Sequence, residues 1–283
     1  ILYNQTRFAE HGLDTPGAHW SWERDVIQAG KKVTRDLDGD GNMDIFFLSP
    51  LGVLEWFPWV TAGDGRMFSE DGLQFLGDSP AGHDALQFEG DLIHVHKIMP
   101  SIEERADDAF AFAKGTSVYC LEGSWFIGTM RRLGISWEWD AAEVPTFKGM
   151  QATNIWPETP WAIPSTAPDP DLSWQVLRFI GSQEGQLTVA KLGLATPILQ
   201  SVARSSQYLR QSPPANMAGF VEMAMKPGTV PLPSIPGWGS ALQALRPAYD
   251  AVMAGNKSAS AALGEVSAAI EAQLRQAQQN MRK

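Results

Sequence analysis

Cysteine is almost absent from this chain, and long apolar runs are missing. Cys120 is the single cysteine in 283 residues, so an internal disulfide is excluded, and its place inside an apolar stretch predicts a small buried hydrophobic residue. No run of about 18 apolar residues occurs, because Pro, Glu and Ser interrupt the most apolar segment, DIFFLSPLGVLEWFPWV. The sequence therefore indicates neither a disulfide-stapled miniprotein nor a membrane-spanning helix.

Basic residues are scarce relative to acidic ones. The chain has 22 Lys and Arg against 32 Asp and Glu, a formal net charge of -10 and a pI near 5.0. Proteins that bind nucleic acid need a basic surface that releases counterions from the phosphate backbone. This charge balance argues against a nucleic-acid partner and favours a neutral or cationic ligand.

Motifs that prepare a nucleophile or bind a nucleotide phosphate are missing as well. The sequence contains no G-x-S-x-G, no P-loop and no G-x-G-x-x-G. The lone cysteine lies in an apolar pattern, which is unlike the partly exposed environment of a reactive thiol. We therefore do not expect an enzyme.

The chain does contain alternating strand and helix patterns, which are typical of an α/β protein. Ser21 is expected to cap one helix, and Ser101 with Glu104 has the spacing of a capping box at the start of another. Asp169, followed by proline, is expected to cap the helix that continues as LSWQVLRFIG. Residues 213–239 are rich in Pro and Gly, which predicts an irregular connection before the terminal helices.

Five segments follow one another in a recognisable order. They are ILYNQTRFAEHGLDTPGAHWSWERDVIQAGKKVT, KGTSVYCLEGSWFIG, EVPTFKG, WAIPSTAPDPDLSWQVLRFIGSQEGQ, and PSIPGWGSALQALRPAYDAVMAGNKSASAALGEVSAAIEAQL. In this order they resemble the sugar-binding proteins of ABC importers, the maltodextrin-binding-protein-like family of extracellular solute-binding proteins. The resemblance covers essentially the whole chain, and the order of the segments is more specific than any one of them.

The resemblance implies a periplasmic-binding-protein-like α/β fold with two lobes. Residues 1–149 and 195–283 would form the second lobe, and residues 150–194 would belong to the first. Family members carry an opening segment that builds most of the sheet of the first lobe, so we expect an N-terminally incomplete chain with a partial first lobe. Apolar side chains such as Leu177, Phe179 and Ile180 would then lie exposed.

The resemblance also implies a function. The protein would bind a carbohydrate, and more specifically an oligosaccharide, outside the cytoplasmic membrane and deliver it to the permease subunits of an ABC transporter. It would be periplasmic, or extracellular and anchored to the membrane as a lipoprotein. Two alternatives stay open: a glycoside hydrolase, because tryptophan-lined clefts also serve enzymes with paired carboxylates, and a non-catalytic carbohydrate-recognition module stabilised by calcium.

Sugar sites combine flat aromatic rings with hydrogen-bonding carboxylates and amides, and the chain has 11 tryptophans. The resemblance assigns the stacking ring of the family's GSW motif to Trp125. One of Trp56 and Trp59 is expected to face the ligand and the other the core. The full set of candidate ligand-binding residues is Trp125, Trp56, Trp59, Trp238, Trp156, Glu122 and Asp64, with Glu55 as a further hydroxyl acceptor.

Each of these residues also has an interpretation that involves no ligand. Most tryptophans are expected to pack in the core, among them Trp174 on a helix and Trp137 and Trp139 on a strand. Solvated carboxylates are the simpler interpretation of Glu122 and of Asp64. At Trp156 the relatives often carry glycines, so its role is open.

One acidic segment has the oxygen-ligand spacing of a calcium loop. The candidate ligands are Asp36, Asp38, Asp40, Asn42 and Asp44. An EF-hand also needs a bidentate Glu at loop position 12, where this chain has Phe47. A structural calcium ion is therefore one expectation, with no other cofactor, and an ion-free surface loop is the alternative.

Overall fold

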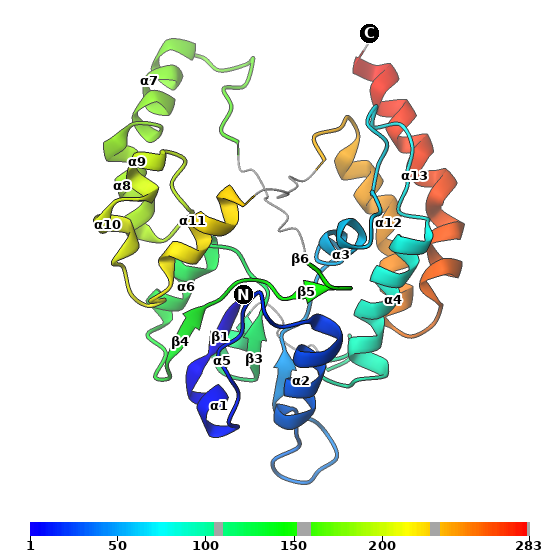
Figure 1. Ribbon diagram of the computed structural model, residues 1–283. Helices are drawn as coiled ribbons and strands as arrows, with labels where there is room; N and C mark the ends of the chain where they lie inside the picture. The colour runs from blue at the N-terminus through cyan, green and yellow to red at the C-terminus, as the bar shows by residue number, and fades with distance from the viewer. Residues whose placement is uncertain (105–109, 152–159, 227–232, 282–283) are drawn as a thin grey trace.

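The computed structural model describes residues 1–104, 110–151, 160–226 and 233–281. A four-stranded sheet lies at its centre (Figure 1), with the strand order β2-β3-β1-β4. The strands are β1 (Leu2–Asn4), β2 (Phe46–Leu48), β3 (Ser117–Cys120) and β4 (Trp139–Ala141). Strand β2 runs parallel to β3, whereas β1 runs antiparallel to both β3 and β4. A hairpin of β5 (Thr146–Phe147) and β6 (Met150–Gln151) follows.

One group of helices packs with the larger hydrophobic core. Figure 1 shows most of it to the right of the sheet. Helix α4 contacts α3, α12 and α13, and α12 lies along α13. The group consists of the π-helix η1 (Trp22–Val26), α2 (Ile27–Val33), α3 (Phe57–Ala62), α4 (Pro80–His94), α12 (Trp238–Met253) and α13 (Ala259–Met281).

A second core lies on the other side of the sheet, around Phe126, Met130, Trp139 and Tyr208. The helices that contribute to it include α6 (Trp125–Leu133), α8 (Gln183–Leu192), α9 (Gln200–Ala203), α10 (Ser206–Leu209) and α11 (Met217–Met225). Helix α7 (Pro170–Ile180) packs against α8. The short helices α1 (Gln5–Glu10) and α5 (Ala111–Lys114) complete the described elements. Because Leu2 and Cys120 belong to this core whereas their strand neighbours Tyr3 and Tyr119 belong to the larger one, both faces of the sheet are covered.

Local signals in the sequence account for most helix starts. The Ser21 hydroxyl accepts from the backbone N–H of Arg24, and Asp169 accepts from that of Leu172 at 2.8 Å. Ser101 and Glu104 exchange two hydrogen bonds, of 2.7 and 3.3 Å, as in a capping box. These three capping predictions are confirmed. Of the helix expected after Ser101, residues 105–109 lie outside the described residues, residues 102–104 form a turn, and Ala111–Lys114 form the short helix α5.

The prediction of an irregular connection over residues 213–239 is wrong in part, because α11 lies inside it. Asn216 caps this helix by accepting from the N–H of Gly219 at 3.1 Å. The segment that follows, MAGFVEMAM, is made largely of good helix formers. The prolines on both sides of this short helix made the whole segment look irregular by composition.

Helix α7 has no buried residue. Phe179 is 55% exposed, as expected from the sequence, whereas Leu177 and Ile180 are half-buried. Trp174 is 56% exposed, so its expected place in the core is wrong, while Trp139 is buried as expected. Helix α7 packs against α8, and none of its residues belongs to either hydrophobic core.

Candidate functional site

The candidate binding site forms where two parallel strands end. Strand β2 is followed by the segment that carries Glu55, and β3 is followed by the turn that carries Glu122 and Trp125. Because β2 and β3 are parallel, both segments leave the sheet at the same edge. Ligands of open α/β sheets bind outside the carboxyl ends of the strands, so this edge has the right position for a site.

Trp125 is the exposed aromatic side chain at this edge. It is the first residue of α6 and 50% exposed. Its indole Nε1–H donates to Glu122 Oε2 at 3.0 Å. The ring lies directly over Gly123, since a Cβ built there would come within 2.0 Å of the ring atom Cζ3. Trp125 and Glu122, two separate candidates from the sequence, are therefore joined by a direct hydrogen bond.

Of the two carboxyl groups at this edge, the charge of Glu55 acts on Glu122. Burial raises the pKa of Glu122, and the nearby negative charge of Glu55 raises the same pKa further. Burial also raises the pKa of Glu55, which accepts from the N–H groups of Gly52 at 2.9 Å and Leu54 at 3.1 Å. Carboxyl oxygens beside an exposed ring can accept the hydroxyl hydrogens of a polyhydroxylated ligand. The site thus combines a flat face with acceptors.

Trp56 and Trp59 do not belong to this surface. Their side chains are 0% and 1% exposed, and Trp59 stacks on Phe147 with ring centroids 5.5 Å apart. Helix α3 begins next to Trp56, whose ring packs edge-on against Phe57, while Trp59 packs edge-on against Phe88 of α4. The expectation that one of them faces the ligand is contradicted, because neither ring presents a face to solvent.

The other candidates lie elsewhere. Trp238, the first residue of α12, is half-buried and packs edge-on against Phe57 and Phe68 with centroids 6.1 and 5.7 Å apart. Asp64 is exposed after α3, with φ of 60°. Within the described residues, no hydrogen bond or ring contact joins either residue to Trp125. Trp156 lies outside the described residues.

Cys120 is buried, as expected, and burial raises the pKa of its thiol to about 12. A thiol with that pKa is almost entirely protonated at neutral pH and is a poor nucleophile.

Gly123 is the residue of the site that sequence reasoning missed. A glycine directly before Ser124 and Trp125, in the turn from strand to helix, was the feature of the sequence that could have identified it.

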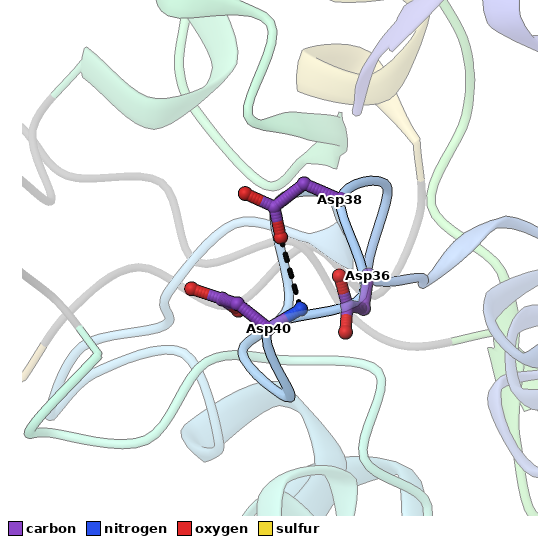
Figure 2. Close-up of side chains that lie close together, drawn as sticks. All are labelled: Asp36, Asp38 and Asp40. Atoms are coloured by element: carbon purple, nitrogen blue, oxygen red, sulfur yellow. Dashed lines mark hydrogen bonds between the residues drawn. The ribbon is translucent and has the colours of Figure 1, made fainter.

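The acidic loop after α2 brings three carboxylates together (Figure 2). Oxygens of Asp36, Asp38 and Asp40 lie within 4.8 Å of one another. Both oxygens of Asp36 accept backbone N–H groups, from Gly39 at 2.6 Å and Gly41 at 2.8 Å, and these bonds hold the pKa of Asp36 below its usual range. The loop is thus ordered by its own hydrogen bonds.

The two remaining candidate ligands have partners of their own. The Asn42 side-chain amide donates to Asp40 at 3.1 Å, and Asp44 accepts from the N–H of Leu37 at 2.7 Å. Phe47, at the position of the bidentate Glu, is fully buried in β2. An EF-hand ligand set is therefore incomplete, and an ion here would depend on the three clustered carboxylates together with backbone or water oxygens.

Within the described residues no helix has the length and apolar character needed to cross a membrane.

A mixed α/β chain with an exposed indole and two carboxyls at the sheet's carboxyl edge has the features of a small-molecule binding protein. The family of bacterial extracellular solute-binding proteins matches residues 1–218. The chain belongs to this family.

Solved structures with the same fold come from several bacteria. An ABC substrate-binding protein from Listeria monocytogenes in complex with cycloalternan aligns with a TM-score of 0.79 at 18% identity, over 96% of this chain and 68% of that chain. The maltose/maltodextrin-binding domain from Bdellovibrio bacteriovorus, bound to maltotriose, gives 0.77 at 21% identity, over 97% and 70%. The cyclic alpha-maltosyl-1,6-maltose binding protein from Arthrobacter globiformis gives 0.69 at 23% identity, over 97% and 69%.

These alignments confirm the expected two-lobe, periplasmic-binding-protein-like α/β fold. No curated protein sequence matches the chain. The division into residues 1–149, 150–194 and 195–283 stays a prediction.

Proposed function

We propose that the protein binds a carbohydrate, of the oligosaccharide class, outside the cytoplasmic membrane and delivers it to the permease subunits of an ABC importer. The observation that carries the proposal is the half-exposed indole of Trp125, held beside the Glu122 carboxylate at the sheet edge. Membership of the solute-binding family supports it. So do relatives of the same fold that were solved with bound maltotriose and cycloalternan.

In this proposal Trp125 and Glu122 contact the ligand. The exposed face of Trp125 stacks on the C–H face of a sugar ring, which is a favourable contact for flat aromatic side chains. Within the described residues, Oε1 of Glu122 has no hydrogen-bond partner, and it accepts a sugar hydroxyl. Asp64, Trp238 and Trp156 stay candidate ligand-binding residues. Closure of two lobes over the ligand is a population shift and involves no bond breaking.

Calorimetry with a panel of oligosaccharides, including maltotriose, tests the proposal. Saturable binding without turnover is expected, and Trp125→Ala should weaken it about tenfold or more, since a buried aromatic anchor contributes more than about 1.4 kcal/mol. Trp174→Ala, which removes a similarly exposed indole on α7, is the matched control and should leave the affinity unchanged. Release of shorter sugars from the same samples would instead identify a glycoside hydrolase and overturn the proposal.

Location and metal content complete the proposal. Periplasmic location, or attachment to the outer face of the membrane as a lipoprotein, follows from the role of delivering solute to a permease. A structural calcium ion in the loop of Asp36, Asp38 and Asp40 is supported by the closeness of the three carboxylates. That ion would stabilise the loop and take no part in sugar binding.

A further inference from the structure

The indole of Trp125 is fixed by two contacts before any ligand is present. An exposed tryptophan at the start of a helix would ordinarily sample several rotamers. Here Nε1–H donates to Glu122 Oε2 at 3.0 Å, and the six-membered ring rests on the backbone at Gly123. The turn thus covers the part of the ring that lies against Gly123, while the residue as a whole stays 50% exposed.

Gly123 makes this arrangement sterically possible. A Cβ at residue 123 would lie 2.0, 2.2 and 2.4 Å from three atoms of the Trp125 ring. Real Cβ atoms do not approach other heavy atoms so closely, so any other residue would push the ring away from the turn. The lack of a side chain at residue 123 therefore permits the observed position of the Trp125 ring, which packs directly on the backbone of Gly123.

Glu122 supplies the second constraint. Its Oε2 accepts the indole N–H and also lies 3.4 Å from the N–H of Gly123. A hydrogen bond to an ionised acceptor is shorter and stronger than one between neutral groups. Because Glu122 and Trp125 are three residues apart in one turn, the bond closes a local ring that fixes the orientation of the indole about its own axis.

We propose that Glu122 and Gly123 are positioning residues that hold Trp125 as a preformed stacking platform for the ligand. Ordering a rotamer-rich side chain on binding weakens affinity, and a platform that is ordered beforehand avoids this cost. The inference rests on the proposed function in taking a sugar as the ligand. It assigns Glu122 a role that acts through Trp125, in addition to any direct contact of Oε1 with the ligand.

A double-mutant cycle separates the two roles. Glu122→Gln keeps an oxygen that can accept from the indole, whereas Glu122→Met keeps the length and removes the acceptor. Trp125→Phe keeps a flat ring and removes the donor. We expect Glu122→Gln to lower maltotriose affinity by about threefold at most, and Glu122→Met to lower it by about three- to tenfold, the range for one side chain that must be ordered on binding.

In the Trp125→Phe background, Glu122→Met should cost at most about twofold more, because the bond it would break is already gone. An equal loss in both backgrounds would overturn the positioning role, since Glu122 would then act on the ligand directly. Gly123→Ala should lower the affinity about as much as Glu122→Met. Gly239→Ala is its control, because a Cβ at Gly239 meets nothing within 4 Å.

The ligand-free protein supplies a readout that does not depend on sugar binding. The indole N–H resonance of Trp125, assigned in a nitrogen-15 spectrum by its loss in Trp125→Phe, should keep its position in Glu122→Gln. In Glu122→Met it should move upfield and exchange faster with solvent. An unchanged resonance in Glu122→Met would overturn the inference. If the unmodified protein binds no sugar of the panel, the proposed function fails, and this resonance alone decides whether the platform exists.

Discussion

Glu55 and Glu122 follow two parallel strands and lie close enough for the charge of Glu55 to raise the pKa of Glu122. Burial raises the pKa of Glu55 above its ordinary value of 4.5. Ionisation of Glu55 therefore costs the folded state more than the unfolded state. The contribution of Glu55 to stability is fully present below the ordinary value and is lost as the pH rises through the raised pKa.

Glu55→Gln should accordingly raise the melting temperature at neutral pH, and the gain should shrink to nothing near about pH 4. The amide oxygen can still accept the N–H groups of Gly52 and Leu54, which bond to a single oxygen in the carboxyl group. Thermal melts across this pH range provide the measurement. A gain that grows toward acid pH would contradict the sign of the pKa shift.

At the residue scale, local hydrogen bonds such as helix caps can be predicted from the sequence, whereas the burial of a side chain cannot. Ser21, Asp169 and the pair Ser101 and Glu104 cap as predicted, because capping depends on neighbours within three residues. Whether a tryptophan is buried depends on distant packing. Trp59 meets Trp22 and Phe147, which lie far away in the sequence, and no local pattern distinguishes its environment from that of Trp125.

Helix α6 approaches the turn after α8 so closely that a side chain at Gly128 would collide with backbone. A Cβ there would lie 2.6 Å from the Leu192 carbonyl oxygen and 2.8 Å from that of Gly193, and the N–H of Gly128 donates to Gly193 at 3.1 Å. Gly128→Ala should destabilise the fold by about 1–3 kcal/mol, the usual cost of overpacking, as measured by denaturant unfolding.

Gly239→Ala in the first turn of α12 is the matched control for Gly128→Ala, since its Cβ would point into open space. Alanine has the higher helix propensity, so this variant should be neutral or more stable by up to about 1 kcal/mol. Equal destabilisation by both variants would show that the effect at Gly128 does not come from the contact between α6 and the turn after α8.

The acidic loop after α2 gives a second prediction at the scale of elements. If Asp36, Asp38 and Asp40 hold calcium, a concentration of about 100 times the Kd should stabilise the protein by about 2.7 kcal/mol. The melting temperature should rise with calcium and fall on chelation. Asp38→Asn with Asp40→Asn should abolish the rise while leaving sugar affinity intact. An unchanged melting temperature with calcium would identify an ion-free loop, ordered by the bonds from Gly39 and Gly41 to Asp36.

At the scale of the whole molecule, the order of motifs along the chain was enough to predict the fold class, which the solved relatives confirm. The sheet itself could not be predicted residue by residue. Each of its strands has only three or four residues, too few for a period of two to be distinguished from a buried helix turn. The parallel pairing of β2 with β3 joins segments about 70 residues apart, and this pairing brings Glu55 near Glu122.

The outer face of α7 leads to a prediction about the whole chain. Leu172, Val176 and Phe179 recur at helical spacing and are 56%, 52% and 55% exposed. A contiguous apolar stripe of this kind marks an interaction surface or an aggregation liability. The chain of 283 residues should therefore bind a hydrophobic dye and self-associate as its concentration rises, because water-exposed apolar area is removed when two stripes meet.

Replacing Leu172, Val176 and Phe179 with Gln should abolish dye binding and shift sedimentation toward the monomer. Stability should change by no more than about 0.5 kcal/mol per substitution, since no residue of α7 is buried. Arg178→Ala alters an exposed polar position of the same helix that lies off the stripe and should leave association unchanged. If the triple variant associates as strongly as the unmodified chain, the stripe is not the contact surface, and another exposed group such as Leu192, Leu194 and Ile198 at the end of α8 must form it.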